Sequence, residues 1–339
     1  MKTPVLFLIF NRPEPTKKVF AAIRQARPER LFVAADGPRL LVEGEAERCN
    51  QTRKIIESVD WPCEVKTHFL NENLGCGKAV SKAITWFFEH VEEGIILEDD
   101  CVPNQDFFFY CISMLERYRH DMRVMQIAGT SYLGEALMHR DGHYLSKHGN
   151  QWGWATWRRA WALYDFEIKR FHDPDARLRM RKFMADDLIA EYLEGCYKAL
   201  VEGRVDTWDY QWWFVCKLNG GLSVRTFRNL ITNIGHDGAH SHQKVKTHDL
   251  ESFAIDRSKI NDCCDNRWVV RKADQTEFKF IGLYPKYPML MKVSKKIRSL
   301  FWAVACTMLG SRAELLYNHL RLLKRSAKST LLFMRKSPR

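Results

Sequence analysis

Short apolar runs alternate with helical patterns along the first part of the chain. The predicted buried strands are residues 5–10, 31–35, 65–70, 94–97 and 124–128, and the predicted helices are residues 14–27, 43–59, 77–90 and 106–119. Parallel strands need crossover connections, and helices provide them. The alternation therefore predicts an α/β fold, doubly wound, with a mostly parallel sheet and helices on both faces.

Polar residues stand where four of these strands end. Asn11 and Arg12 follow the first strand and Asp36 follows the second, while the polar segment 71–77 follows the third. Three consecutive acids, residues 98–100, follow the fourth. Ligands of open α/β sheets bind beyond the carboxyl ends of the strands. We therefore expect these side chains to meet at one ligand site.

The acidic triplet is the most specific of these signals. Adjacent carboxylates repel one another, and burying them is costly unless they are paired or bound to a metal ion. An exposed acidic turn is the alternative interpretation. Oxygen ligands at a strand end suit a hard divalent ion such as Mg²⁺ or Mn²⁺, which also binds phosphate oxygens. Such an ion stabilises a diphosphate leaving group.

Two common nucleotide-binding motifs are absent. No G-x-G-x-x-G follows the first strand, which argues against a dinucleotide site. Residues 73–78 lack the upstream glycine spacing of a P-loop, so Lys78 is not a P-loop lysine. These absences favour transfer from a nucleotide diphosphate over hydride chemistry.

The cysteines give no sign of a zinc site or a disulfide framework. Ten cysteines are scattered along 339 residues without a C-x-x-C pair. Such usage is typical of a reducing cytoplasm. The apolar run 5–10 has no small-residue cleavage site after it, so we interpret it as a strand and not as a signal peptide.

The net charge of +12 belongs to the C-terminal segment. Residues 283–339 contain 13 Lys and Arg and one acid, Glu314, so the remainder has a net charge of zero. A neutral body without alternating aromatic and basic residues predicts no nucleic-acid partner. Basic residues interleaved with leucines predict interfacial helices on an anionic membrane surface. The alternative is a helical cap packed on the body.

Two tryptophan-dense stretches lie in the middle of the chain. They are residues 151–161, QWGWATWRRAW, and residues 207–214, TWDYQWWF. Tryptophans at helical spacing are more often core residues, but aromatic faces beside polar groups also hold sugar rings. Arg158 and Arg159 are expected on a solvated helix face, and Asp186 and Asp187 at a helix start.

These motifs, in their order along the chain, resemble a known family. FNRP (10–13), AADGPR (34–39), NENLGCGKAV (71–80), ILEDDCVPNQDFF (96–108), GWATWRRAW (153–161) and TWDYQW (207–212) are similar to the GT-A glycosyltransferases. Within these the chain most resembles bacterial nucleotide-diphospho-sugar transferases of surface polysaccharide synthesis. It is more distantly similar to the transferase that adds N-acetylglucosamine to the N-glycan mannose core. The resemblance covers roughly residues 4–245.

The resemblance assigns donor-binding roles position by position. Arg12 and Asp36 match positions that hold the nucleotide, with Asp36 accepting a hydrogen bond from the uracil ring. Asp100 matches the metal ligand, Asp99 a ribose or water-mediated partner, and Glu98 a contact to the donor sugar.

Four further residues join the donor-binding candidates. Asn11 is included because it stands beside Arg12 at a strand end. Asn73, Gly75 and Lys78 are included because the segment 71–77 and the start of the following helix face the same edge. The alternative for this segment is a turn with its helix cap.

The resemblance also implies a catalytic base and a second metal ligand. Trp208 and Asp209 match a Trp–Asp pair whose carboxylate is the base, and Trp208 is grouped with the donor-binding residues. An acceptor hydroxyl must lose its proton as it attacks, and Asp209 is a lone acid in an aromatic run. The alternatives are a helix N-terminal carboxylate, and Asp206 as a rival base. A histidine of residues 233–242 corresponds to a loop near the diphosphate: His240 is taken as a metal ligand, and His236 and His242 compete with it.

Together these features predict a metal-dependent inverting glycosyltransferase. Mn²⁺ or Mg²⁺ is the expected cofactor, a UDP-sugar the expected donor, and a lipopolysaccharide, capsule or lipid-linked glycan the expected acceptor. The rivals are a sugar-nucleotide nucleotidyltransferase and a non-catalytic binding protein with a basic tail. Residues 1–128 are expected to bind the nucleotide sugar, 129–282 to bind the acceptor and supply the base, and 283–339 to form the tail. The expected location is cytoplasmic, peripheral on the inner face of the cytoplasmic membrane.

Overall fold

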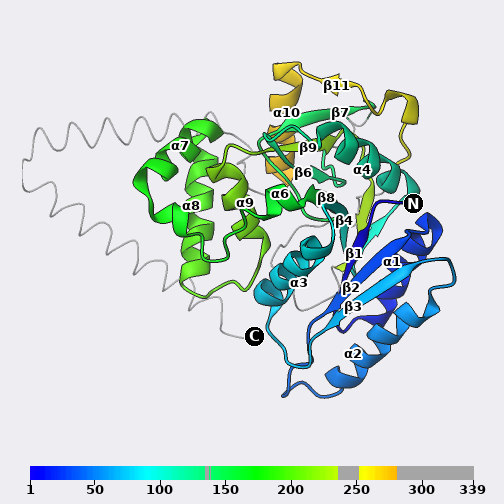
Figure 1. Ribbon diagram of the computed structural model, residues 1–339. Helices are drawn as coiled ribbons and strands as arrows, with labels where there is room; N and C mark the ends of the chain where they lie inside the picture. Colours follow the sequence, from blue (N-terminus) through cyan, green and yellow to red (C-terminus); the bar gives the residue numbers. More distant parts are fainter. Residues whose placement is uncertain (134–136, 138, 236–251, 281–339) are drawn as a thin grey trace, which may run out of the picture. The chain divides into compact units, whose positions relative to one another are not determined.

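The computed structural model describes residues 1–133, 137, 139–235 and 252–280 (Figure 1). These residues belong to one compact unit, Met1–Tyr284. The basic tail predicted for residues 283–339 lies outside the described range. Within that range, no helix is both long and apolar enough to cross a membrane.

Strands and helices alternate through the first part of the chain, as predicted. The strands are β1 (Val5–Ile9), β2 (Arg30–Ala35), β3 (Glu64–Phe69), β4 (Glu93–Glu98), β5 (Cys101–Pro103), β6 (Val124–Ala128), β7 (His143–Ser146), β8 (Trp154–Trp157), β9 (Leu222–Thr226), β10 (Ile231–Asn233) and β11 (Cys263–Cys264). The α-helices are α1 (Pro13–Ala26), α2 (Glu45–Lys54), α3 (Cys76–His90), α4 (Gln105–Tyr118), α6 (Arg158–Trp161), α7 (Pro174–Met184), α8 (Asp187–Val201), α9 (Asp209–Leu218) and α10 (Arg267–Phe280). Three 3₁₀ turns are η1 (Ile55–Ser58), η2 (Lys169–His172) and η4 (Arg257–Lys259).

Nine of the described strands form one mixed sheet in the order β11-β7-β9-β6-β8-β4-β1-β2-β3. Strands β3, β2, β1 and β4 are parallel to one another, and β8 runs antiparallel between β4 and β6. From β1 the chain continues to β2 and β3 on one side, and β4 then pairs on the other side. This reversal creates a switch point at the carboxyl end of β1, where open α/β sheets bind ligands. The predicted α/β fold with a mostly parallel sheet is confirmed.

The central strands bury both faces. In β1, Val5, Phe7 and Ile9 pack in the apolar cluster that includes side chains of α1 and α4. Leu6 and Leu8 point to the other face and pack in the cluster that includes side chains of α3 and α9. Successive side chains of a strand point to opposite faces, so β1 is apolar throughout because helices cover both sides.

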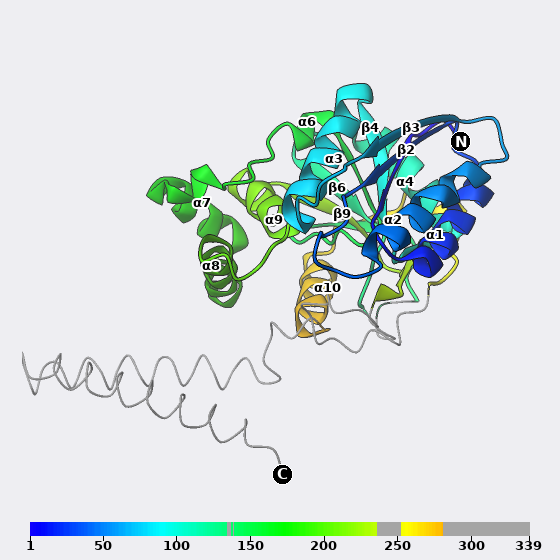
Figure 2. The ribbon, with the colours of Figure 1, turned by 90° about the horizontal axis from the view of Figure 1, so that it is seen from below.

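Helices α7, α8 and α9 form a separate group beside the sheet (Figures 1 and 2). Their apolar side chains, with Phe171 of η2, make a third cluster that includes Met180, Leu193 and Phe214. Helix α9 contributes to this cluster and to the one on the sheet. It therefore links the helical group to the sheet.

Two details differ from the sequence predictions. Strand β3 was expected to be buried, but it is the edge strand of the sheet and Val65 is 37% exposed. Arg159 was expected on a solvated face, but its guanidinium donates to the backbone carbonyls of Tyr118, Arg119, Asp121 and Val124. It fastens the turn between α4 and β6, which no local pattern signals.

Candidate active site

A cavity of about 620 Å³ lies at the carboxyl ends of β1, β2 and β4. Its wall includes most of the candidate residues: Asn11, Arg12, Asp36, Asn73, Gly75, Glu98, Asp99, Asp100, Trp208 and Asp209. Lys78 is exposed on α3 and does not line the cavity. His236, His240 and His242 lie outside the described residues. The fold thus brings together residues from four strand ends and from the start of α9.

Arg12 neutralises two acids of the triplet. Its guanidinium is ion-paired with Asp99, and one of its terminal nitrogens lies 3.0 Å from Asp100 Oδ2. Burial works to lower the pKa of Arg12, but the two carboxylates raise it above the usual value. Burial also raises the pKa of Asp99 to about 6, against the effect of Arg12. The buried charge of the triplet is therefore partly balanced by the residue that follows β1.

Glu98 has no such partner. No hydrogen bond or ion pair reaches its carboxyl from the described residues, and its side chain lines the cavity. Burial raises the pKa of Glu98 well above its usual value, and Asp100, Asp209 and Asp99 raise it further. Glu98 therefore takes up a proton more readily than a free carboxyl group does, and in its protonated form it can donate a hydrogen bond to a ligand.

The side chains at this site supply only some of the ligands that a hard divalent ion needs. No group of three or more His, Cys, Asp and Glu side chains suited to a metal ion occurs in the described part of the chain. Mg²⁺-type sites in proteins use one or two carboxylates and complete the shell with waters and phosphate oxygens. Asp100 and its neighbours can supply those carboxylates. The residues therefore fit an ion that arrives with a phosphate-bearing ligand.

Asp36 organises the loop that follows β3. Its Oδ1 accepts from Gly37 N at 2.8 Å and Leu74 N at 2.9 Å. Its Oδ2 accepts from Asn73 Nδ2 at 3.0 Å and Gly75 N at 3.1 Å. A carboxylate has about four acceptor positions, and these four bonds occupy them. Direct acceptance from a uracil ring, which the resemblance implies, would require one of these bonds to break.

Asp206, the rival base, caps helix α3 in this structure. Its Oδ1 accepts from Gly77 N at 3.0 Å, which satisfies one of the free amides at the helix N-terminus. Gly75 precedes the helix with φ +81°, and a Cβ there would lie 2.4 Å from Asp206 Oδ2. A glycine is needed at residue 75 for both reasons. Asp206 therefore has a structural task independent of proton transfer.

Asp209 begins α9 and lines the cavity. Its Oδ1 accepts from the Thr207 hydroxyl and, at 2.8 Å, from its neighbour's amide, Tyr210 N. These bonds fix the orientation of the carboxylate. Asp209 is also close enough to Glu98 and Cys76 to raise the pKa of both groups. Asp209 thus lies near the acids at the end of β4.

The tryptophans divide between core and cavity. Trp154 and Trp212 are fully buried, and Trp208 is 2% exposed and stacks on Trp154 with ring centroids 5.6 Å apart. Trp208 belongs to this buried cluster and also forms part of the cavity wall. Trp152 and Trp213, by contrast, are half-buried and line the cavity. The sequence motif thus contains both kinds of tryptophan.

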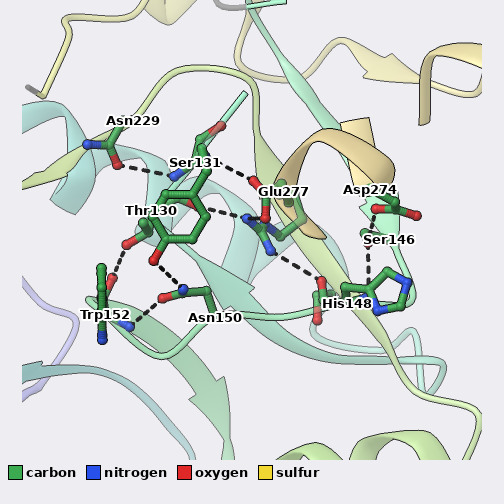
Figure 3. Close-up of polar contacts among 12 residues, drawn as sticks. Thr130, Ser131, Ser146, His148, Asn150, Trp152, Asn229, Asp274 and Glu277 are labelled. Atoms are coloured by element: carbon green, nitrogen blue, oxygen red, sulfur yellow. Dashed lines mark hydrogen bonds and ion pairs between the residues drawn. The ribbon is translucent and has the colours of Figure 1, made fainter. Parts of the chain in front are cut away.

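The inner wall of the cavity contains groups that the sequence did not indicate. Arg225 of β9 is buried and ion-paired with Glu277 of α10, and it also donates to Thr130 O at 3.0 Å. Arg225 also donates to His148 O at 3.4 Å, so the pair connects the segment 148–152 to α10. Figure 3 shows Glu277, His148 and Asn150 within this network of polar contacts. The sequence hints at this pair only through an arginine inside a largely apolar strand. Its partner Glu277 lies 52 residues further along the chain, so no local pattern connects the two.

The burial of Asp274 in this network predicts that the free energy of unfolding depends on pH. Burial raises its pKa from 3.8 to about 7, although Ser146 Oγ donates to it at 2.5 Å. The folded state therefore holds this proton more tightly than the unfolded state, and stability is lost as the pH rises from about 4 to about 7. The unfolding free energy of the wild-type protein should therefore fall between about pH 5 and pH 8. In the Asp274→Asn variant, which cannot lose this proton, we expect that fall to be smaller by about 1–3 kcal/mol. Urea denaturation at both pH values measures this, and an equal fall in both proteins would contradict it.

Comparison with known proteins leaves the family open. No family model matches this chain, and no curated protein matches it. HddC from Yersinia pseudotuberculosis has a TM-score of 0.29 and 11% identity over 46% of this chain and 77% of its own. The 4-diphosphocytidyl-2C-methyl-D-erythritol synthase of Anaerococcus prevotii has a TM-score of 0.30 and 7% identity, over 51% of this chain and 78% of its own. The glycosyltransferase GlyE of Streptococcus pneumoniae has a TM-score of 0.28 and 12% identity, over 51% of this chain and 40% of its own. At these TM-scores the likeness carries no functional argument.

Proposed function

We propose that this protein is a metal-dependent inverting glycosyltransferase that uses a nucleotide-diphosphate sugar, with a UDP-sugar as the first candidate. One observation carries the proposal: acids from the end of β4 and from the start of α9 line one cavity at the switch point of the sheet. Sugar transfer needs a positive centre for the leaving diphosphate and a base for the acceptor hydroxyl. The two groups of acids suit these two tasks.

On the donor side, Asp100 is the proposed ligand of Mn²⁺ or Mg²⁺, together with phosphate oxygens and water. When bound, such an ion supplies Lewis-acid stabilisation to the leaving diphosphate. Arg12 already holds Asp99 and Asp100, so it fixes the carboxylates and offers a second positive charge to the phosphates. Glu98, which lines the same cavity, is the proposed contact to a donor-sugar hydroxyl.

On the acceptor side, Asp209 is the proposed base. The bonds from Thr207 and Tyr210 N hold one carboxylate oxygen, which aims the group into the cavity. A single base opposite the leaving diphosphate gives direct displacement and therefore inversion at the anomeric carbon. Asp36 is proposed to act on the nucleotide through the loop that it anchors, since its own acceptor positions are in use.

A screen of nucleotide sugars tests this proposal. The protein is incubated with UDP-, GDP-, CDP- and dTDP-sugars, with Mn²⁺ or with EDTA, and nucleoside diphosphate release is measured. We expect release from at least one donor, only with the metal ion, and a product of inverted anomeric configuration by NMR. Formation of pyrophosphate from a nucleoside triphosphate and a sugar phosphate would instead support the nucleotidyltransferase alternative.

We also propose that residues 283–339 hold the enzyme on an anionic membrane surface, where a lipid-linked acceptor is confined. The basis is the charge of this segment, 13 Lys and Arg against one acid. Each cation near an anionic surface contributes about 1 kcal/mol. We expect sedimentation with anionic vesicles at low salt, reduced at high salt, and lost when the residues after 282 are removed. Equal binding of the truncated protein, or no binding of the full chain, would contradict the proposal.

A further inference from the structure

Among the described residues, four lysine and arginine side chains line the cavity, and three of them are ion-paired. The pairs are Arg12 with Asp99 and Asp100, Arg39 with Glu45, and Arg225 with Glu277. The fourth is Lys217, which is only 5% exposed. Within the described part of the chain, no hydrogen bond or ion pair reaches its ammonium group. A buried ammonium without an anion is costly, so its place in a cavity wall points to a ligand.

Lys217 belongs to an ordered face of α9. Tyr210, Trp213 and Lys217 follow one another at helical spacing, so they lie on one side of the helix, and all three line the cavity. The Lys217 Nζ lies 5.5 Å from the centre of the Trp213 ring. The indole is held in turn, because its Nε1 donates to Gln151 Oε1 at 2.8 Å. The structure thus presents a fixed aromatic ring with a cation beside it.

The groups around Lys217 do not cancel its charge. Burial lowers its pKa to about 8, with weaker opposing effects of Cys216, Cys196 and Asp274. The ammonium form therefore predominates at neutral pH. Burial also lowers the pKa of His148, another residue of the cavity wall, well below its usual value, so that imidazole is neutral. Lys217 supplies the local positive charge.

We propose that Lys217 binds an anionic group of the acceptor glycan, a carboxylate or a phosphate ester, while the Trp213 ring packs on the sugar that carries it. This assignment to the acceptor rests on the proposed function. Lys217 follows Asp209 by two turns of α9, about 12 Å along the helix axis. That length leaves room for more than one sugar ring between the reacting hydroxyl and the anionic group. The preferred acceptor would therefore be an acidic glycan.

Matched sugar pairs test the proposal without any donor. Methyl β-D-glucuronide differs from methyl β-D-glucoside at C6, and glucose 6-phosphate differs from glucose by its phosphate. Saturation-transfer NMR titrations give each dissociation constant. We expect the wild-type protein to bind the anionic member of at least one pair about tenfold more tightly, the range of a charge-assisted hydrogen bond. The pair that shows the preference identifies the anion.

Variants then locate the preference. Lys217→Met should abolish it, and Lys217→Gln provides a second, smaller replacement if the first protein does not fold. The matched control is Lys198→Met on α8, since Lys198 is exposed and paired with Glu202, and this change should alter nothing. Equal affinity within both pairs, or a preference that survives both Lys217 variants, would overturn the proposal. A loss of UDP affinity in those variants would also overturn it, by placing Lys217 at the donor.

These outcomes are separate from those of the donor screen. If no nucleotide sugar is cleaved but the anion preference persists and depends on Lys217, the proposed function fails and the anion site stands. If donors are cleaved and no preference is found, the proposed function stands and the Lys217 proposal fails.

Discussion

Asp209→Asn is expected to lower the turnover of sugar transfer at least about 10²-fold, the usual contribution of a general base. The asparagine keeps an oxygen that Thr207 and Tyr210 N can donate to, so the start of α9 should stay in place. Donor affinity should change little because the replaced group acts on the acceptor. Steady-state kinetics with a donor found by screening, and circular dichroism for the fold, measure these effects.

Asp206→Asn is the matched control for this experiment. It makes the same chemical change three residues away and keeps an oxygen to accept from Gly77 N at the start of α3. We expect its turnover to stay within a few-fold of wild type. If the Asp206 variant is the inactive one and Asp209→Asn turns over normally, the base has been assigned to the wrong residue.

Asp100→Asn is expected to lower turnover at least about 10³-fold, because Lewis-acid stabilisation of a leaving group is worth several kcal/mol. The ion pair between Arg12 and Asp99 remains in this variant, so the fold should be retained. Asp60→Asn is a suitable control, since Asp60 is an exposed acid paired with Arg24 away from the cavity. Wild-type turnover of the Asp100 variant at low Mn²⁺ would remove Asp100 from the metal site.

Much of the sheet was predictable because its signals are local. An apolar run bounded by polar residues gave β1, β2, β4 and β6 within one or two residues, and helical spacing gave α1, α3 and α4. The acids at the end of β4 were predictable for the same reason, since they stand where a strand pattern stops. Asp209 stood out as a lone acid in an aromatic run. Such inferences need no knowledge of the distant chain.

What could not be predicted depends on pairing across long stretches of sequence. The insertion of β8 between β4 and β6 joins residues about 60 positions apart, and β6 pairs with β9 from nearly 100 positions away. The exposure of β3 follows from its edge position, which only the strand order reveals. Tryptophan patterns could not separate the buried Trp212 from Trp213 on the cavity wall, because neighbours on a helix face different directions.

The central claim is that the cavity at the switch point binds a nucleoside diphosphate together with a divalent ion. Calorimetric titration of the full-length protein with UDP, GDP, CDP and dTDP, each with Mn²⁺ or with EDTA, tests it most directly. We predict that at least one nucleotide binds with Mn²⁺, and that this binding is lost in EDTA and in Asp100→Asn. No binding of any nucleotide, or binding that is the same with Mn²⁺ and with EDTA, would contradict the claim.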